Sequence, residues 1–137
     1  MHKILLLCCL VFCAQAQALE QNRAVSPFNK IKSQGAFKVV VNVGAPFAIK
    51  VSGDEKFFAR IKTDIVANEL KISDTENHNV SVSDSHQITI SLPLLLSYKM
   101  EGAGMTSLNQ IQGESFELAY EGVGLLKASG KVANFRL

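Results

Sequence analysis

Hydrophobic and polar residues alternate along most of this chain. Apolar side chains recur at every second position, and a spacing of two places them on one face of a β-strand. β-branched residues dominate the earlier runs, which favours strand over helix. The alternation predicts strands at Phe37–Val43, Phe47–Val51, Leu70–Ile72, Val80–Val82, Ile88–Ile90, Leu92–Met100, Phe116–Tyr120 and Ala133–Leu137. The chain is therefore expected to be all-β.

Glycines punctuate the later strands in a repeating pattern. The motif Glu-Gly-x-Gly occurs at Glu101–Gly104 and again at Glu121–Gly124, a spacing of roughly 20 residues. Strands and glycine turns at that period predict a β-solenoid, whose stacked units share one core. Two hairpin turns of an antiparallel sandwich would supply the same glycines, and the pattern alone leaves that alternative open. The glycines assigned to the corners are Gly102, Gly104, Gly113, Gly122, Gly124 and Gly130.

The order of several short motifs resembles the family called putative auto-transporter adhesin, head GIN domain. The motifs are Arg23–Ile31, Gly35–Val41, Glu69–Ile72, Tyr98–Gly104 and Ile111–Gly113, followed by the second Glu-Gly-x-Gly. The resemblance covers residues 23–137 and implies a right-handed β-helix-like solenoid with glycine corners. The function of the family is essentially uncharacterised, and its name implies surface binding. The glutamate before each corner departs from the family pattern, and the missing further repeats imply a solenoid that is short or truncated at its C-terminus.

The segment Glu55–Ile72 fits two descriptions. Phe57 to Lys62 could begin a helix, with Asp54 as its N-cap. The alternation from Ile61 to Ile65 and the family resemblance favour a strand instead. Asn68–Glu69 is typical of a hairpin tip.

The N-terminus indicates export. A basic start, the apolar run Ile4–Cys13 and the small residues around Ala16 and Ala18 predict a signal peptide over residues 1–18. A lipoprotein signal ending at Cys13 is the weaker alternative, because a bulky Phe12 precedes the cysteine. One domain is expected over residues 19–137, in the periplasm, at the outer membrane or secreted. Removing the signal removes every cysteine, so no disulfide is expected in the mature chain.

Composition excludes some function classes and leaves others open. The net charge of +2 gives no electrostatic footprint for nucleic acid. No segment after the signal is apolar for long enough to span a bilayer as a helix. No nucleophile-elbow, P-loop, zinc-protease or catalytic-cysteine motif is present, so no enzyme activity is predicted.

Two groups of charged residues could in principle bind a cation. The first has the ligand types Asp74, Glu76, His78, Asp84 and His86, but their spacing matches no metal motif and solvated turns have the same composition. The second is the pair Glu101 and Glu121, which stacked units would place about 4.8 Å apart as a surface carboxylate ladder. Lysines such as Lys99 or Lys127, a bound cation such as calcium, or splayed side chains would offset the repulsion. Screening by lysine and water is favoured, and no metal or cofactor is predicted.

The aromatic residues are expected mainly in the core. Tyr98 and Tyr120 fall within the apolar alternation, so packing is favoured over stacking on a sugar ring. The full aromatic set considered is Phe57, Phe58, Tyr98, Phe116, Tyr120 and Phe135.

The sequence supports three hypotheses for function. The favoured one is an exported, non-enzymatic, adhesion-like module that binds an unknown envelope or extracellular ligand, for example a glycan, through a flat sheet face or the corner loops. The alternative is a structural envelope protein that forms homo-oligomers by stacking through the open C-terminal unit. A polysaccharide-active enzyme is the weakest hypothesis, because no acidic cluster has a cleft to act in.

Overall fold

The structure is a computed structural model and describes residues 19–75 and 86–137. Its ten strands and one helix confirm the all-β prediction. The elements are β1 (Leu19–Asn22), β2 (Lys30–Gln34), β3 (Lys38–Val43), β4 (Ala48–Gly53), α1 (Glu55–Arg60), β5 (Ile61–Val66), β6 (Glu69–Asp74), β7 (Gln87–Leu92), β8 (Ser97–Glu101), β9 (Met105–Glu121) and β10 (Leu125–Arg136). The signal segment 1–18 and the strand predicted at Val80–Val82 lie outside the described residues.

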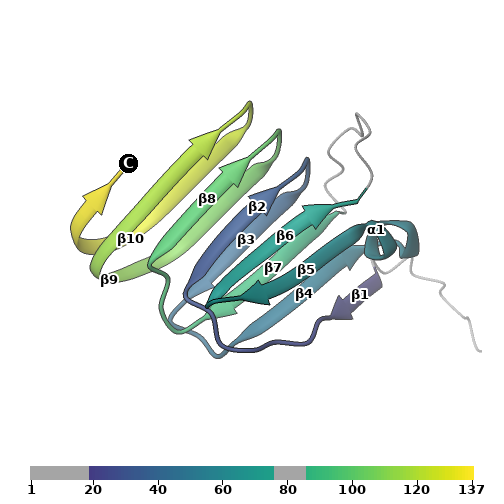
Figure 1. Ribbon diagram of the computed structural model, residues 1–137, viewed down its shortest axis with the longest axis horizontal. Coiled ribbons are helices and arrows are strands. Elements are labelled where there is room, and N and C mark those ends of the chain that lie inside the picture. The colour runs from purple at the N-terminus through teal and green to yellow at the C-terminus, as the bar shows by residue number, and fades with distance from the viewer. Residues whose placement is uncertain (1–18, 76–85) are drawn as a thin grey trace, which may run out of the picture.

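The strands form one open sheet that curls into a half-barrel (Figure 1). Strand order is β1-β4-β7-β3-β9-β8-β2-β6-β5, with β10 paired to β9. Pairing is parallel through the middle, for example between β2 and β8 and between β3 and β7. It becomes antiparallel towards the N-terminal end, between β1 and β4, β4 and β7, and β5 and β6. The right-handed β-helix stays a prediction, and the antiparallel pairs depart from a purely parallel stack.

Strand β9 joins the two halves of the sheet. Its first residues pair with β3 and its last residues pair with β8. The curl places inward side chains from both halves in a single apolar cluster, which includes Val41 and Ile90 from one half and Ile31 and Leu70 from the other. The hydroxyls of Tyr98 and Thr106 hydrogen-bond within this core at 3.1 Å, so these two buried groups satisfy each other.

The strand preferred for residues 55–60 is wrong, because this segment is the helix α1. Asp54 has an extended backbone, and its carboxylate accepts a 2.8 Å hydrogen bond from the backbone N–H of Phe57. This N-cap satisfies a donor that the first helical turn leaves unpaired, and Phe57 is buried beneath it. The strand prediction holds for β5, and the hairpin tip lies at Ala67 and Asn68, which both have positive φ.

The single strand predicted over Leu92–Met100 is also wrong. Strand β7 ends at Leu92, and β8 begins only at Ser97. The loop between them breaks the alternation, so that Leu95 is buried while Leu94 is exposed. Pro93 follows β7 directly, where its missing N–H costs no ladder hydrogen bond.

Glycines of successive turns lie close to one another's backbone. Those between β8 and β9 lie against the turn between β2 and β3, and those between β9 and β10 lie against the turn between β8 and β9. A Cβ added to Gly104 would lie 2.6 Å from the carbonyl oxygen of Phe37, and one added to Gly124 would meet the carbonyl oxygen of Gly104. Gly102 and Gly122 also have positive φ, which L-residues rarely adopt. Close backbone approach therefore explains why the corners use glycine.

The N-terminal end of the sheet is tied down by Arg23. Its guanidinium donates hydrogen bonds to the carbonyl oxygens of Phe58, at 2.7 Å, and Ile61, at 3.0 Å.

No helix in the described part of the chain is long and apolar enough to cross a membrane.

Candidate binding surfaces

The curled sheet presents two outer faces with different chemistry. We call the outward side chains of β6, β2, β8 and residues 117–121 of β9 the lysine face. We call the outward side chains of β4, β7, β3 and residues 105–109 of β9 the amide face. Inward and outward residues alternate on each strand, as the burial of Ile31 and Ser33 beside partly exposed Lys32 shows. In-register pairing therefore arranges outward side chains in rows that cross the strands.

The central row of the lysine face consists of like charges. Lys32 of β2 pairs in register with Lys71 of β6 on one side and with Lys99 of β8 on the other. Neighbouring strands lie about 4.8 Å apart, and like charges directly opposite one another destabilise a sheet. The row ends at Asp64 of β5 and at Ala119 of β9. We call Lys71, Lys32 and Lys99 the lysine row.

One carboxylate partly neutralises this row. Glu101 Oε1 lies 3.4 Å from Lys99 Nζ and 3.8 Å from Lys32 Nζ. Its other oxygen accepts a 2.6 Å hydrogen bond from the side-chain amide of Gln34. That hydrogen bond, with the two lysines, lowers the pKa of Glu101 below the usual glutamate range despite partial desolvation. Glu101 is therefore held ionised beside the row.

The predicted carboxylates occupy neighbouring strands of this face. Glu101 and Glu121 are register partners in the pairing of β8 with β9. Lys99 contacts Glu101, as the sequence analysis considered, but Gln34 and Lys32 were missed. In the sequence, each of these three strands carries a lysine between two inward-facing residues, and this was the signal available for the row. The strand register then brings the three lysines together.

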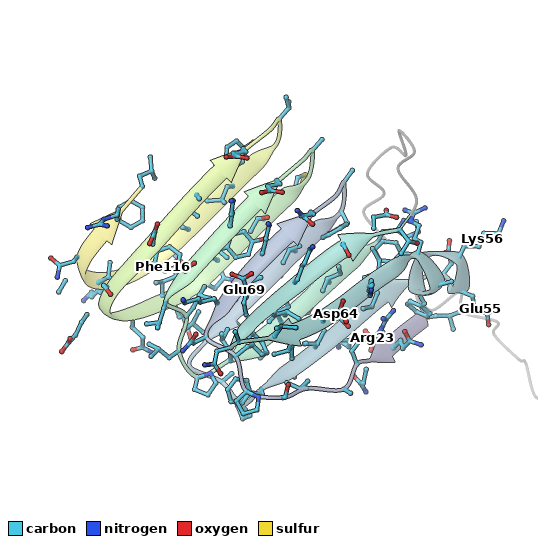
Figure 2. The ribbon with its side chains drawn as sticks, viewed as in Figure 1. Arg23, Glu55, Lys56, Asp64, Glu69 and Phe116 are labelled. Carbon is cyan, nitrogen blue, oxygen red and sulfur yellow. The ribbon has the colours of Figure 1, made fainter. Side chains whose placement is uncertain are left out.

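Acidic side chains border the lysine row on both sides. Figure 2 shows Asp64 and Glu69 extending from β5 and β6. Asp64 forms a 3.4 Å ion pair with Lys62 of its own strand. Glu69 belongs to the next row across the strands, where it pairs in register with Lys30. The lysine row is thus bordered by acidic residues on both sides, with Lys30 next to Glu69 in the neighbouring row.

The amide face carries two lysines, Lys38 and Lys50, and its other outward residues are uncharged. The side-chain amide of Asn109 donates a 3.2 Å hydrogen bond to the side-chain oxygen of Asn42. On its other side Asn42 pairs in register with Ser91, so these three neighbouring side chains are polar and uncharged. The next row pairs Thr89 with Val40 and Val40 with Ser107.

Large apolar side chains are exposed where β10 forms the edge of the sheet. Phe135 is 55 % exposed although it pairs in register with buried Phe116, and their rings stack at 6.1 Å. Tyr120, predicted in the core, is 41 % exposed and donates a 2.6 Å hydrogen bond to the carbonyl oxygen of Gly124. Both side chains point inward by alternation. Pairing of β10 with β9 reaches only Glu117 and so does not cover Tyr120, and no strand beyond β10 covers Phe135 among the described residues.

The residues considered for a transition metal have other roles where they are described. Asp74 forms a 3.2 Å ion pair with Arg60. His86 stacks on Phe57 at 4.5 Å and lies 3.4 Å from the cap residue Asp54. Glu76, His78 and Asp84 lie outside the described residues. Within residues 19–75 and 86–137, no group of three or more His, Cys, Asp or Glu could hold a metal.

Comparison with known proteins places this fold among adhesin-like domains. A family model described as "Putative auto-transporter adhesin, head GIN domain" matches residues 27–137. No protein with a curated description matches the chain.

Several crystal structures share the fold. A putative adhesin from Bacteroides fragilis is 18 % identical with a TM-score of 0.73, over 87 % of this chain and 56 % of that one. A putative lipid binding protein from Parabacteroides distasonis is 16 % identical with a TM-score of 0.59, over 86 % and 58 %. A putative cell adhesion protein from Clostridium sporogenes is 20 % identical with a TM-score of 0.55, over 85 % and 64 %. The chain thus spans less than two thirds of the length of these structures.

Proposed function

The chain belongs to the family described as putative auto-transporter adhesin, head GIN domain, and we propose that it is an exported, non-enzymatic binding module. It binds an envelope or extracellular ligand, with glycans as the first class to test, on a flat outer face of the sheet. The observation that carries this proposal is the array of in-register side chains over a buried core. Such a surface is rigid and pre-organised, which lowers the entropic cost of binding. The adhesion descriptions of similar structures support it.

Binding is tested with the mature chain, residues 19–137, against a panel of neutral and acidic glycans. A ligand that binds only the folded state raises the melting temperature in proportion to its concentration. We expect at least one glycan class to do so, and to lose the effect when outward residues of one face are changed. The proposal fails if no glycan and no cell-wall or outer-membrane polysaccharide fraction shifts the melting temperature.

Export is proposed from the signal-like N-terminus, which would leave a single domain from residue 19. Intact-mass measurement of the chain secreted by a bacterial host should give a first residue close to Leu19. A chain that keeps Met1 and remains in the cytoplasm would contradict export. A lipid-modified Cys13 would replace the soluble form by a membrane-anchored one.

We also propose that the repeating unit is a coil of a right-handed β-helix-like solenoid. The stacked corner glycines and the parallel pairing of β8 with β9 and of β9 with β10 support this. Duplicating residues 105–124 should then add one coil, because stability in stacked repeats is close to a sum of nearest-neighbour terms. The expected product is a monomer of unchanged β content and higher unfolding free energy. Loss of the β spectrum would contradict the solenoid.

Self-assembly is the second candidate, and exposed Phe135 and Leu125 at the edge formed by β10 favour it. Unpaired strand edges and apolar side chains invite another chain. Light scattering after size exclusion should then give an oligomer whose mass falls when Phe135→Lys is introduced. A monomer at all concentrations would remove this candidate and leave the binding module intact.

A further inference from the structure

We propose that the lysine row of Lys71, Lys32 and Lys99 binds a linear polyanion, namely an acidic polysaccharide that carries a carboxylate on each sugar. The polymer would run across β6, β2 and β8, perpendicular to the strands. This inference rests on the proposed binding function and names the chemical class of its ligand.

The first support is the charge of the row. Lys32 and Lys99 share a single carboxylate, that of Glu101. Lys71 forms no ion pair with any residue that the structure describes. Lysines in register on three adjacent strands place like charges opposite each other, and within the row only Lys71 has an acidic register partner, Asp64. Rules of stability are broken mainly where function requires it, and an added anion would relieve this repulsion.

The second support is the spacing of the charges. Cationic groups recur at about 4.8 Å, the distance between adjacent strands. Two such intervals separate Lys71 from Lys99 and are close to the length of two sugar units in an extended polysaccharide. Carboxylates that project from the same side of the polymer, on alternate sugars, can therefore meet these two lysines. Lysine is a flexible point charge, and it tolerates small differences in period. Ala119 is the next position after Lys99 and is too small to obstruct the polymer.

The third support is what borders the row. Glu101 and Glu121 pair in register on one side, and on the other Glu69 and Glu117 lie at the two ends of a row that also contains Lys30. These carboxylates would repel a planar anionic membrane, which must approach the whole face. A single extended chain can follow the positive stripe and avoid both acidic borders. The arrangement therefore favours a linear polymer over a lipid surface.

The opposite face provides a matched control. The amide face carries Lys38 and Lys50, and Lys127 of β10 lies next to it as the register partner of Ser107. Lys38 and Lys127 pair in register with uncharged residues, and Lys50 forms a 3.4 Å ion pair with Glu20. Changing these three lysines removes the same net charge as changing the lysine row. Any effect of net charge alone is therefore equal in the two triple variants.

The experiment measures binding of labelled polygalacturonate to the mature chain, residues 19–137, by fluorescence polarisation. Neutral dextran and vesicles that contain anionic phospholipid are the comparison probes. We expect polygalacturonate to bind, with an affinity that falls as salt is raised, and dextran and vesicles not to bind. The variant K32Q/K71Q/K99Q should lose at least about tenfold in affinity, and K38Q/K50Q/K127Q should stay within about twofold of the parent chain. Circular dichroism and melting temperature verify that both variants fold.

A second variant tests the inference through a gain of affinity, which a poorly folded protein could not produce. Glu101→Gln removes the carboxylate that occupies Lys32 and Lys99, so the affinity for polygalacturonate should rise by about threefold to tenfold. Equal affinity of the two triple variants, or tighter binding to vesicles than to polymer, would overturn the inference. Binding of dextran that is insensitive to the lysine row would overturn it while keeping the proposed binding function. No binding to any glycan would overturn both.

Discussion

The two outer faces of the curled sheet share one scaffold and differ in the side chains that they expose. Both display rows of side chains set by the same register, and β9 contributes residues to both. On the amide face, the side-chain amide of Asn109 donates a hydrogen bond to Asn42, so the polar groups of the row pair with each other. On the lysine face, Lys32 lies between two further lysines. The register therefore aligns outward residues in rows on both faces, and the residue type decides whether neighbours in a row stabilise or repel each other.

The contrast has an energetic side. Compatible cross-strand pairs contribute roughly 0.2–1 kcal/mol each, and like charges directly opposite are destabilising. The lysine row opposes the stability that the shared core supplies, whereas the amide row adds to it. Substitutions in the core, in a turn or on one face should therefore affect stability and binding differently.

The largest effect should come from the shared core. Ile90→Ala removes a fully buried side chain of β7 and leaves a cavity beneath both faces. We expect the unfolding free energy to fall by about 2–5 kcal/mol in a urea titration. Thr89→Ala, on the outer surface of the same strand, is the control and should cost far less. A loss below about 1 kcal/mol for Ile90→Ala would contradict a core shared by the two faces.

A corner between the faces is the next most sensitive position. Gly104→Ala places a Cβ 2.6 Å from the carbonyl oxygen of Phe37, a backbone atom that cannot move aside alone. Overpacking of this kind costs about 1–3 kcal/mol, measured as a lower urea midpoint at an unchanged m-value. Ala103→Ser, at an exposed position of the same turn, should be close to neutral. Equal stability of the two variants would show that the corners do not approach as closely as described.

These positions also show how far sequence reasoning reaches. Alternation located the strands of the stack, because burial of one face imposes a period of two. It favoured a strand over α1, where the local cap by Asp54 outweighs strand propensity, and it missed the inward turn at Leu95. Tyr120 follows the inward alternation but is exposed, because exposure depends on a neighbouring strand and not on the residue itself.

The candidate site depends even more on long-range geometry. Gln34 and Glu101 are 67 positions apart in the chain and lie within 2.6 Å of one another. The register between β2 and β8 creates this contact and the lysine row together. A single sequence carries no direct signal of parallel register, so the carboxylates could be predicted from their repeat but their partners could not.

A smaller effect should come from the amide face. Asn109→Ala removes the 3.2 Å hydrogen bond to Asn42 and should lower the unfolding free energy by about 0.5–1.5 kcal/mol. Binding to polygalacturonate should not change, because Asn109 lies on the opposite face. Ser107→Ala on the same strand and face is the matched control. Weaker polymer binding in Asn109→Ala would show that the amide face also contributes to binding and would contradict the separation of the two faces.

The smallest effect concerns pH. The folded-state pKa of Glu101 lies below its unfolded value, so its ionised form contributes stability above the usual glutamate pKa. That contribution is lost as pH falls through the lowered pKa. Urea midpoints at pH 7 and pH 3 should therefore differ more for the parent chain than for Glu101→Gln. Glu117→Gln controls for the loss of one carboxylate from this face, and an identical pH response in Glu101→Gln and the parent chain would contradict the assignment.

The central claim is that the lysine row serves binding and not stability. Its most direct test compares urea unfolding of the parent chain and Lys32→Gln, each with and without polygalacturonate. We predict that Lys32→Gln unfolds at an equal or slightly higher urea concentration without polymer, because the lysine on each side of Lys32 outweighs its partly exposed 3.8 Å ion pair with Glu101. The polymer should stabilise the parent chain and have much less effect on the variant. A variant that is clearly less stable without polymer, yet gains as much from it as the parent chain, would show that the row is structural and contradict the account.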